Sequence, residues 1–258
     1  MPDVLLVETG DRIAVVTMNR PAARNALNAE LRGAIGENMA ALDADDSIDV
    51  IVLTGADPAF CAGLDLKELG SGGAGLTEEG ESFITRRRGP LPELSKPLIA
   101  AVNGVAITGG FELALNCDFI IASERARFAD THARIGVMPG WGLTVLLPQA
   151  IGIRRAKQLS GTGNFLDART ACEWNLVNQV VPHDELLPFT LSLAADIAGN
   201  DSAGVGHIYR TYDEGALLSA DEAWDLEARR AGEWLAGVKA SDIEERRRAV
   251  TERGRSQL

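Results

Sequence analysis

Two glycine-bearing turns are the features of this chain whose residue types and spacing most suggest chemistry. The first lies in "FCAGLDLKEL", residues 60–69, and the second in "NGVAITGGFELAL", residues 103–115, which opens a helix. At Gly109 and Gly110 the missing side chains let a ligand approach the backbone, and the helix N-terminus adds a positive partial charge of roughly half an elementary charge. A carbonyl oxygen that becomes an enolate would be stabilised there, above all if the turn at residues 62–65 supplied a second N–H group.

Glu112 places a carboxylate beside this backbone site. It lies three residues after Gly109, about one helical turn further on and nearly on the same face. An acid in the first turn of a helix is also favourable for the helix dipole alone, so its position has a structural interpretation too. His132 follows in "FADTHARIGVMPG", two residues after Asp130. An unperturbed imidazole has a pKa of about 6.5 and can act as acid or base.

Three short apolar runs predict the strands that hold these turns. They are "DVIVLTG", "PLIAAVNG" and "DFIIAS", at residues 49–55, 97–104 and 118–123. Each is typical of a strand buried on both faces, and helical segments separate one run from the next. The order strand, helix, strand, helix is that of a largely parallel sheet with crossover helices.

The two ends of the chain predict a hairpin and amphipathic helices. "VLLVETGDRIAVVTMN" is two β-rich runs around Thr9, Gly10 and Asp11. A helix follows, with Asn28 as its N-cap and an apolar stripe formed by Leu31, Ile35, Met39 and Leu42. Near the C-terminus a second stripe alternates spacings of 4 and 3, and its members are Trp224, Ala228, Ala231, Leu235 and Val238. This second stripe needs a surface to pack on, in the same subunit or in a neighbouring one.

Length, charge and cysteine content narrow the class of protein. A chain of 258 residues has room for one large domain or a domain with an appendage. No apolar run approaches the roughly 20 residues of a membrane-spanning helix, and the first residues lack the cations of a signal peptide. The net charge of −12 argues against a nucleic-acid partner. The cysteines, Cys61, Cys117 and Cys172, fit neither a disulfide framework nor a metal-ligand spacing. We expect a cytoplasmic protein that binds no metal, membrane or nucleic acid.

Four stretches, in order, resemble the signatures of the crotonase superfamily, the enoyl-CoA hydratase/isomerase family. They are "AFCAGLDLKEL", "PLIAAVNGVAITGGFELALNCDFIIAS", "ARFAD" and "GVMPGWG". The resemblance extends to "LDARTACEWNLVNQVVPHDEL", which is similar to the family's helix and strand after the active site. It implies an α/β fold of the ClpP/crotonase-like type, a spiral of ββα units with a helical C-terminal region, and trimers or dimers of trimers. We accordingly expect a core with an acyl-CoA site at residues 1–195 and a helical trimerisation region at residues 196–258.

The resemblance also implies an acyl-CoA thioester as substrate, with coenzyme A as part of that substrate and no separate cofactor. The oxyanion hole would be the backbone N–H groups of Leu64 and Gly109. Arg24 would lie near the phosphates of CoA, and the rest of the CoA moiety would lie along Ala62, Leu64, Asp65, Leu66, Lys67 and Gly109. Lys67 has a competing interpretation as a solvated loop charge. Gly140, in "GVMPGWG", is a further possible site residue.

Two other stretches carry glycines or cations. "GSGGAG", residues 70–75, predicts a surface loop ahead of a charged helix with Arg86 to Arg88, and no GK[ST] follows to make it a phosphate loop. "EERRRAVTERGR", residues 244–255, is a solvated helix face or a source of cations across a subunit interface.

By its "GGFEL" motif, Glu112 corresponds to the family's first catalytic glutamate, the general base. The hydratases have a second glutamate 20 residues later, where this chain has His132. Three interpretations of His132 stay open: the second acid/base of an altered hydratase, the catalyst of another crotonase reaction such as isomerisation, decarboxylation or thioester hydrolysis, or a structural residue. Asp130 could substitute for the lost carboxylate or could be a turn residue. We expect an enoyl-CoA hydratase/isomerase-type lyase of lipid metabolism, and the rival hypothesis is a non-catalytic acyl-CoA-binding protein.

Overall fold

The computed structural model describes residues 3–70 and 87–239, together with the single positions 243, 247, 251, 254 and 255. The glycine-rich residues 71–75, Arg86 and most of the cationic segment 244–255 lie outside the described residues. The strands are β1 (Leu5–Gly10), β2 (Ile13–Met18), β3 (Val50–Gly55), β4 (Ala59–Cys61), β5 (Leu98–Val102), β6 (Val105–Ile107), β7 (Phe119–Ser123), β8 (Arg127–Ala129), β9 (Leu166–Asp167) and β10 (Gln179–Val181). The helices are α1 (Ala29–Ala44), α2 (Leu66–Gly70), α3 (Gly109–Leu115), α4 (His132–Ile135), α5 (Leu143–Ile151), α6 (Ile153–Thr162), α7 (Ala168–Glu173), α8 (Leu186–Ala198), α9 (Ser202–Gly215) and α10 (Ala220–Gly237), with 3₁₀ turns η1 (Pro21–Ala23) and η2 (His183–Glu185).

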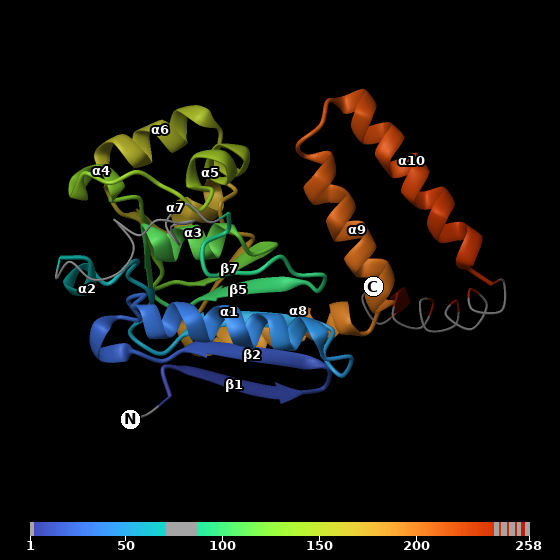
Figure 1. Ribbon diagram of the computed structural model, residues 1–258, viewed down its shortest axis with the longest axis horizontal. Coiled ribbons are helices and arrows are strands. Elements are labelled where there is room, and N and C mark those ends of the chain that lie inside the picture. Colours follow the sequence, from blue (N-terminus) through green and yellow to red (C-terminus); the bar gives the residue numbers. More distant parts are fainter. Residues whose placement is uncertain are drawn as a thin grey trace. The chain divides into compact units, whose positions relative to one another are not determined.

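The larger sheet has the order β1-β2-β3-β5-β7-β10, with β1 at one edge (Figure 1). The pair β1–β2 is antiparallel and every other neighbouring pair is parallel. The predicted hairpin is confirmed, but its turn is made by Asp11 and Arg12, whose φ angles are 50° and 64°. Two positive φ angles in a two-residue loop match the right-handed twist of the flanking strands.

A second sheet, in the order β4-β6-β8-β9, was not predicted from the sequence. Its strands β4, β6 and β8 pair in parallel, and each directly follows a strand of the larger sheet. The chain thus repeats strand, short strand and helix three times: β3, β4, α2; then β5, β6, α3; then β7, β8, α4. These are the ββα units that the resemblance implied, and they bring the helices α3 and α4 next to the ends of the short strands.

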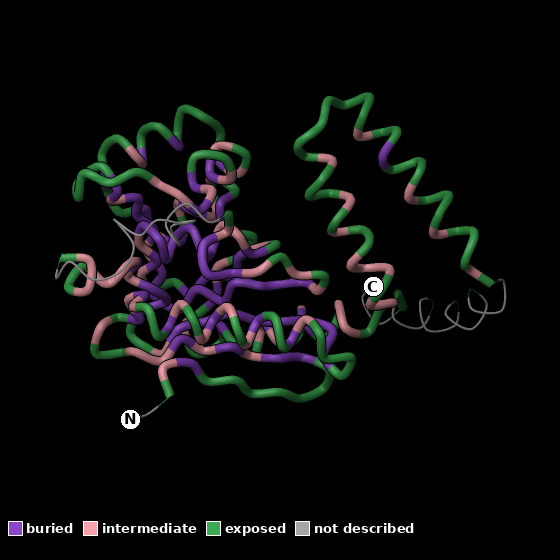
Figure 2. The backbone as a smooth tube through the Cα atoms, viewed as in Figure 1, coloured by how far each residue is buried: buried purple, intermediate pink, exposed green. Residues whose placement is uncertain are grey.

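The inner strands β3, β5 and β7 of the larger sheet are buried on both faces, as their apolar runs predicted (Figure 2). In β3, Ile51 and Leu53 belong to the core cluster that also contains Leu31, Ile35 and Met39 of α1. The alternate residues, Val50 and Val52, belong to a second cluster with Leu186 and Ala194 of α8. Because successive side chains of a strand point to opposite faces, α1 and α8 cover opposite faces of the sheet.

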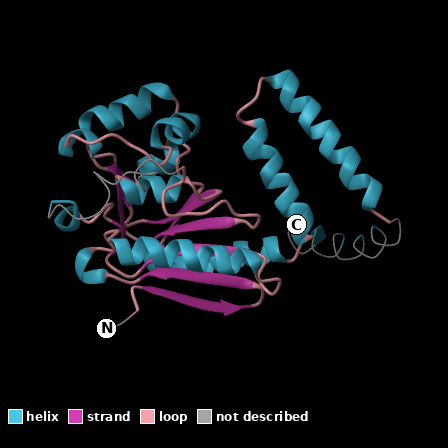
Figure 3. Cartoon of the chain, viewed as in Figure 1, coloured by secondary structure: helices cyan, strands magenta, loops and turns pink. Residues whose placement is uncertain are grey.

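The chain divides into two compact units, residues 1–206 and residues 207–258. In the described part of the chain, every strand lies in the first unit (Figure 3). The predicted C-terminal helix forms as α10, which begins with a capping box between Ser219 and Glu222. The side of α10 that contacts α9 carries Arg230, which bonds Thr211, and Trp234, which stacks on His207. The predicted stripe lies elsewhere on α10, and Trp224 in it is 72% exposed. No described helix has the length and apolar character needed to cross a membrane.

Candidate active site

The two glycine turns pack directly against each other. A Cβ added at Gly63, where φ is 88°, would lie 2.8 Å from the carbonyl oxygen of Ile107 and 3.3 Å from the nitrogen of Gly109. A Cβ at Gly110 would lie 2.1 Å from the carbonyl oxygen of Cys61. Side chains at either position would force the turns apart, so glycine is required for the close approach.

The backbone N–H of Leu64 faces away from its neighbouring segment. Leu27 pairs with Leu64 in a parallel bridge, in which Leu27 donates to the carbonyl of Gly63 and accepts from the N–H of Asp65. In such a bridge the N–H of the central residue points to the opposite side. Among the described residues, the N–H of Leu64 and the first N–H groups of α3 therefore take no part in these backbone bonds, which is the arrangement that an oxyanion hole would need.

Thr108 connects the glycine turn at Gly109 to the segment that carries His132. Its φ and ψ angles are 53° and −113°, a conformation that costs a β-branched residue free energy. Its N–H donates to the carbonyl of Ala129, and its hydroxyl lies 2.6 Å from the hydroxyl of Thr131. These contacts hold Gly109 and His132 in a fixed relation, a role that the sequence did not reveal.

Glu112 is buried, with 2% of its surface exposed, and each of its oxygens has a separate environment. Oε1 accepts hydrogen bonds from the backbone N–H groups of Trp141, at 2.8 Å, and Leu143, at 3.4 Å. Oε2 lies 3.5 Å from Nε2 of His132. The carboxylate is thus held by one oxygen and presents the other to the histidine.

Trp141 is a second site residue that the sequence did not single out. Besides donating to Glu112, it lies so close to the glycine turn at Gly109 that a Cβ added there would be 3.0 Å from its ring atom Cζ3. Its carbonyl accepts from the side chain of Asn116, the C-cap of α3. The signal was present in "GVMPGWG", where Gly140, half-buried, and Gly142 flank an aromatic residue.

His132 is 6% exposed and lies between two buried carboxylates. Its Nδ1 is 2.7 Å from Oδ1 of Asp130, and its backbone N–H donates to the same oxygen at 3.1 Å. Burial disfavours the charged imidazolium, but the hydrogen bonds and charges of Asp130 and Glu112 outweigh it and raise the pKa of His132 to about 9. Burial likewise opposes the charge of Asp130, yet hydrogen bonds from His132 and Ser160 hold its pKa below the usual value. At neutral pH the histidine is therefore an imidazolium.

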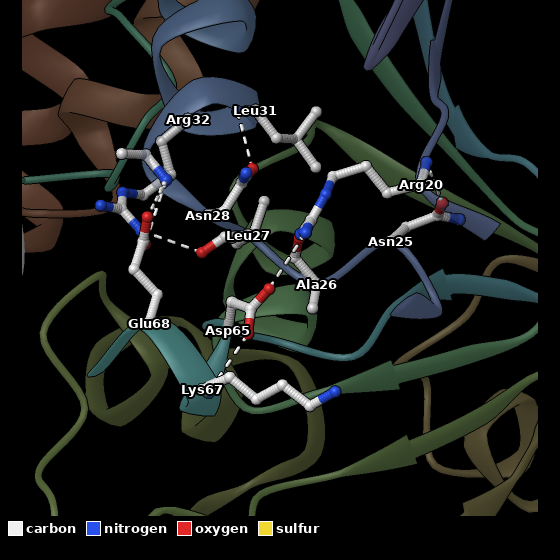
Figure 4. A network of polar contacts seen from close by, with 11 residues as sticks. Arg20, Asn25, Ala26, Leu27, Asn28, Leu31, Arg32, Asp65, Lys67 and Glu68 are labelled. Atoms are coloured by element: carbon white, nitrogen blue, oxygen red, sulfur yellow. Dashed lines mark hydrogen bonds and ion pairs between the residues drawn. The ribbon is translucent and has the colours of Figure 1, made fainter. Parts of the chain in front are cut away.

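Two of the residues expected along CoA, Asp65 and Lys67, lie on a separate polar network (Figure 4). Arg20 donates to Asp65 at 3.1 Å and to the carbonyl of Ala26, and the backbone N–H of Lys67 donates to Asp65 at 3.2 Å. Burial opposes ionisation of Asp65, but these bonds keep its pKa low. The Lys67 side chain extends away from Asp65 in Figure 4. Arg20 is a further residue that the sequence reasoning missed.

The other residues expected along CoA border this network. Arg24 is exposed and has a left-handed φ of 51°, and its carbonyl accepts from the N–H of Ala62. Leu66, the first residue of α2, is 55% exposed. The turn at residues 62–67 is therefore fixed to the segment around Arg24, while the side chains of Arg24 and Leu66 face solvent.

A valine at Gly109 tests the oxyanion hole expected at this turn. The new side chain would press on the ring of Trp141 and block access to the backbone N–H, so kcat/KM is expected to fall by at least the roughly 10²–10³ lost with one oxyanion donor. Steady-state kinetics on a short enoyl-CoA measure the effect. Gly33→Val is the matched control, because a Cβ at Gly33 meets nothing within 4 Å. An unchanged kcat/KM in folded Gly109→Val protein would refute the site.

Comparison with known proteins places these features in a family context. The model of the family described as enoyl-CoA hydratase/isomerase matches residues 8–249. A probable peroxisomal enoyl-CoA hydratase 1 of Arabidopsis thaliana is 36% identical over 242 residues, 94% of this chain and 90% of that protein. The crystal structure of an enoyl-CoA hydratase from Mycobacterium smegmatis has 45% identity and a TM-score of 0.74, covering 91% of this chain and 99% of that one. The crystal structure of an enoyl-CoA hydratase from Bacillus anthracis has 31% identity and a TM-score of 0.87, covering 97% of this chain and 96% of that one.

Proposed function

Because the chain belongs to the enoyl-CoA hydratase/isomerase family, we propose that it hydrates an α,β-unsaturated acyl-CoA thioester with Glu112 as base and His132 as acid. One observation carries this assignment: Oε2 of Glu112 and Nε2 of His132 are 3.5 Å apart in a buried site. Hydration needs one group that takes a proton from water and another that gives a proton to Cα. A carboxylate beside an imidazolium provides these two groups in the required protonation states.

In the proposed binding mode, the thioester oxygen accepts hydrogen bonds from the N–H groups of Leu64 and Gly109. The CoA moiety lies along the turn of residues 62–67, with Arg24 and Lys67 directed at its phosphates. A protein with a net charge of −12 needs such local cations and backbone dipoles to hold an anionic ligand. Arg20 contributes indirectly, because its guanidinium is bonded to Asp65 and keeps the turn in place.

The proposed reaction begins with attack of a water oxygen on Cβ while Oε2 of Glu112 takes a proton from that water. The electrons of the Cα=Cβ bond move toward the thioester, and the resulting enolate oxygen is stabilised by the two N–H groups. Those electrons then form a bond from Cα to the Nε2 proton of His132. Finally the proton on Glu112 passes to the neutral Nε2 across their contact, which restores the carboxylate and the imidazolium.

A second candidate reaction is isomerisation of an enoyl-CoA, and one observation favours it. The two N–H groups of the imidazolium face Asp130 and Glu112, so the ring has no remaining group to hold a water molecule. A single carboxylate that removes a proton from one carbon and returns it to another needs no bound water. In that reaction Glu112 is the shuttle, and the imidazolium of His132 faces its Oε2.

The assay that tests the proposal follows two substrates with purified protein. Loss of the conjugated enoyl-thioester absorbance from a 2-enoyl-CoA, with formation of the 3-hydroxyacyl-CoA, is the expected result. A gain of the same absorbance from a 3-enoyl-CoA, with no hydration, would favour isomerisation. Tight binding of acyl-CoA without turnover of either substrate would contradict both reactions and leave a binding protein.

We also propose that the protein acts in the cytoplasm as a trimer or a dimer of trimers. The support for assembly is the exposed apolar stripe of α10, in which Trp224 and Leu235 are 72% and 64% exposed. Large apolar side chains in such a row are favoured at interfaces between subunits. The support for a reducing compartment is that Cys61, Cys117 and Cys172 are free thiols.

The assembly has a direct test in light scattering. The wild-type protein is expected to have three or six times the mass of one chain at micromolar concentration. Leu235→Glu places a charge in the exposed stripe, so we expect it to shift the protein toward smaller species without lowering the helix content. A wild-type monomer at that concentration would be enough to discard the proposal.

A further inference from the structure

Asp130 contacts both the backbone and the ring of His132 inside the buried site. It is 2% exposed, and its Oδ1 accepts from both the backbone N–H and Nδ1 of His132. We propose that Asp130 is a positioning residue that keeps the Nδ1 of His132 protonated and thereby directs Nε2, as a proton donor, at Glu112. This inference rests on the proposed function, because it assigns Asp130 a role in the acid step of that reaction.

Two hydrogen bonds to Oδ1 of Asp130 together restrain the imidazole. The backbone N–H bond fixes Asp130 to the first turn of α4, at 3.1 Å, and the bond to Nδ1 fixes the rotation of the ring, at 2.7 Å. With Nδ1 bonded to an acceptor that carries no proton, that nitrogen must be the donor. The opposite nitrogen, Nε2, then faces Oε2 of Glu112, the oxygen that has no backbone donor in the described part of the chain.

The charges around His132 come from two elements. Glu112 faces it from α3, and Asp130 faces it from the segment ahead of α4. Ser160 of α6 bonds Asp130, and Arg134, on the same helix as His132, is engaged with Thr162 and Asn164. Within the described residues, two carboxylates and one imidazolium therefore share the buried site. Removing the charge of Asp130 leaves Glu112 as the single counterion among the residues that the structure describes.

This arrangement gives Asp130 a defined effect on the reaction. After His132 gives its Nε2 proton to Cα, the neutral ring must be the tautomer with Nδ1 protonated, because Asp130 holds that proton. Nε2 is then the basic nitrogen and takes back the proton that Glu112 collected from water. Without Asp130 the neutral ring could carry its proton on Nε2, and the return of the proton from Glu112 would be blocked.

Nuclear magnetic resonance of isotope-labelled histidine tests this in the substrate-free enzyme. The chain has three histidines, His132, His183 and His207, so a His132→Gln variant assigns the signal. In the wild type we expect titration of His132 near pH 9 and a protonated Nδ1 in its neutral form. Asp130→Asn keeps an acceptor but removes the charge, so the midpoint should fall by about 1–3 pH units. Asp130→Ala should also remove the preference of the neutral ring of His132 for a proton on Nδ1.

Asp57→Asn is the matched control, because Asp57 makes a similar carboxylate contact, at 3.0 Å, with Nε2 of His183. It should alter the His183 signal and leave that of His132 in place. In the hydration assay, the rate should fall as pH rises through the His132 midpoint, and Asp130→Asn should move this fall to lower pH by the same amount as the midpoint. Asp57→Asn should leave the pH profile of hydration unchanged.

An unshifted His132 midpoint in folded Asp130→Asn protein overturns the inference, as does an Nε2-protonated neutral ring in the wild type. If Asp130→Asn fails to fold, the wild-type tautomer decides the question. The resonance measurements need no substrate, so their failure is distinct from failure of the proposed function. Absence of enoyl-CoA turnover with the expected spectra would reject hydration and uphold the control of His132 by Asp130.

Discussion

Glutamine in place of Glu112 is expected to lower kcat/KM for hydration by about 10²–10⁴, the contribution of a positioned base. The amide oxygen can still accept from the N–H groups of Trp141 and Leu143, so the backbone around the site should be retained. The amide nitrogen, however, then faces the Nε2 proton of His132, and neither group can take a proton from water. The loss should appear in kcat, because the role proposed for Glu112 is on the reacting atoms and not on CoA.

Glu37→Gln is the control for this variant. Glu37 is exposed on α1, and its replacement should leave both kinetic constants unchanged. Circular dichroism of both proteins separates a catalytic loss from unfolding. Full hydration activity in folded Glu112→Gln protein would contradict the assignment of Glu112 as base. A loss of hydration with retained isomerisation would contradict the shared use of this carboxylate by both candidate reactions.

The sequence predicted what is local in this site. Gly109, Gly110 and Glu112 lie within one helical turn, so their neighbourhood follows from helix geometry alone. The strands β3, β5 and β7 were predictable because each is a run long enough to show continuous burial. The position of His132 beside Glu112 was predicted from a family resemblance, and hydrophobic periodicity did not contribute to that prediction.

What the sequence missed depends on contacts between distant segments. The bond from Trp141 to Glu112 spans 29 residues, and the one from Arg20 to Asp65 spans 45. The strands β4, β6 and β8 have three residues each, too few for an alternating pattern to appear. The boundary between the two compact units falls after residue 206, within α9, and α8 packs on the larger sheet. The division into a core at residues 1–195 and a trimerisation region at residues 196–258 stays a prediction.

Asp130 shows the same limit of prediction from sequence for a single side chain. Two residues from His132, it had two sequence interpretations, a substitute carboxylate or a turn residue. The structure directs its Oδ1 at Nδ1 of His132 and at the backbone N–H of the same residue. Only the local backbone conformation at the start of α4 decides between these interpretations, and the residue type does not encode that conformation.

Alanine in place of His132 is expected to lower hydration by about 10²–10⁴, since the proposed proton donor to Cα is lost. The same change leaves Glu112 and Asp130 as two buried carboxylates without their shared cation. Loss of one partner from a buried ion pair costs about 3–5 kcal/mol, so the free energy of unfolding should also fall. Both effects are measured together, by enoyl-thioester absorbance well below the melting temperature and by thermal unfolding.

His183→Gln is the control, because His183 bonds Ser123 and Asp57 and lies outside the Glu112, His132 and Asp130 group. It should leave hydration unchanged whatever it does to the melting temperature. If His132→Ala protein loses stability but turns over every substrate at the wild-type rate, the histidine is structural and its catalytic role should be dropped. If it loses isomerisation and never had hydration, the second candidate reaction is the correct one.

A glutamate at position 132 gives the sharpest form of this test. From the sequence alone, His132→Glu should restore the two carboxylates of the hydratases and raise hydration. In the structure a third carboxylate would then lie beside Glu112 and Asp130, where like charges in a buried site oppose ionisation. We therefore expect His132→Glu to be less stable and no more active than the wild type. The double variant His132→Glu with Asp130→Asn removes the extra charge, and it should regain stability and hydrate the enoyl-CoA faster than the single variant. Equal melting temperatures for the single and double variants would show that Asp130 exerts no electrostatic effect on position 132.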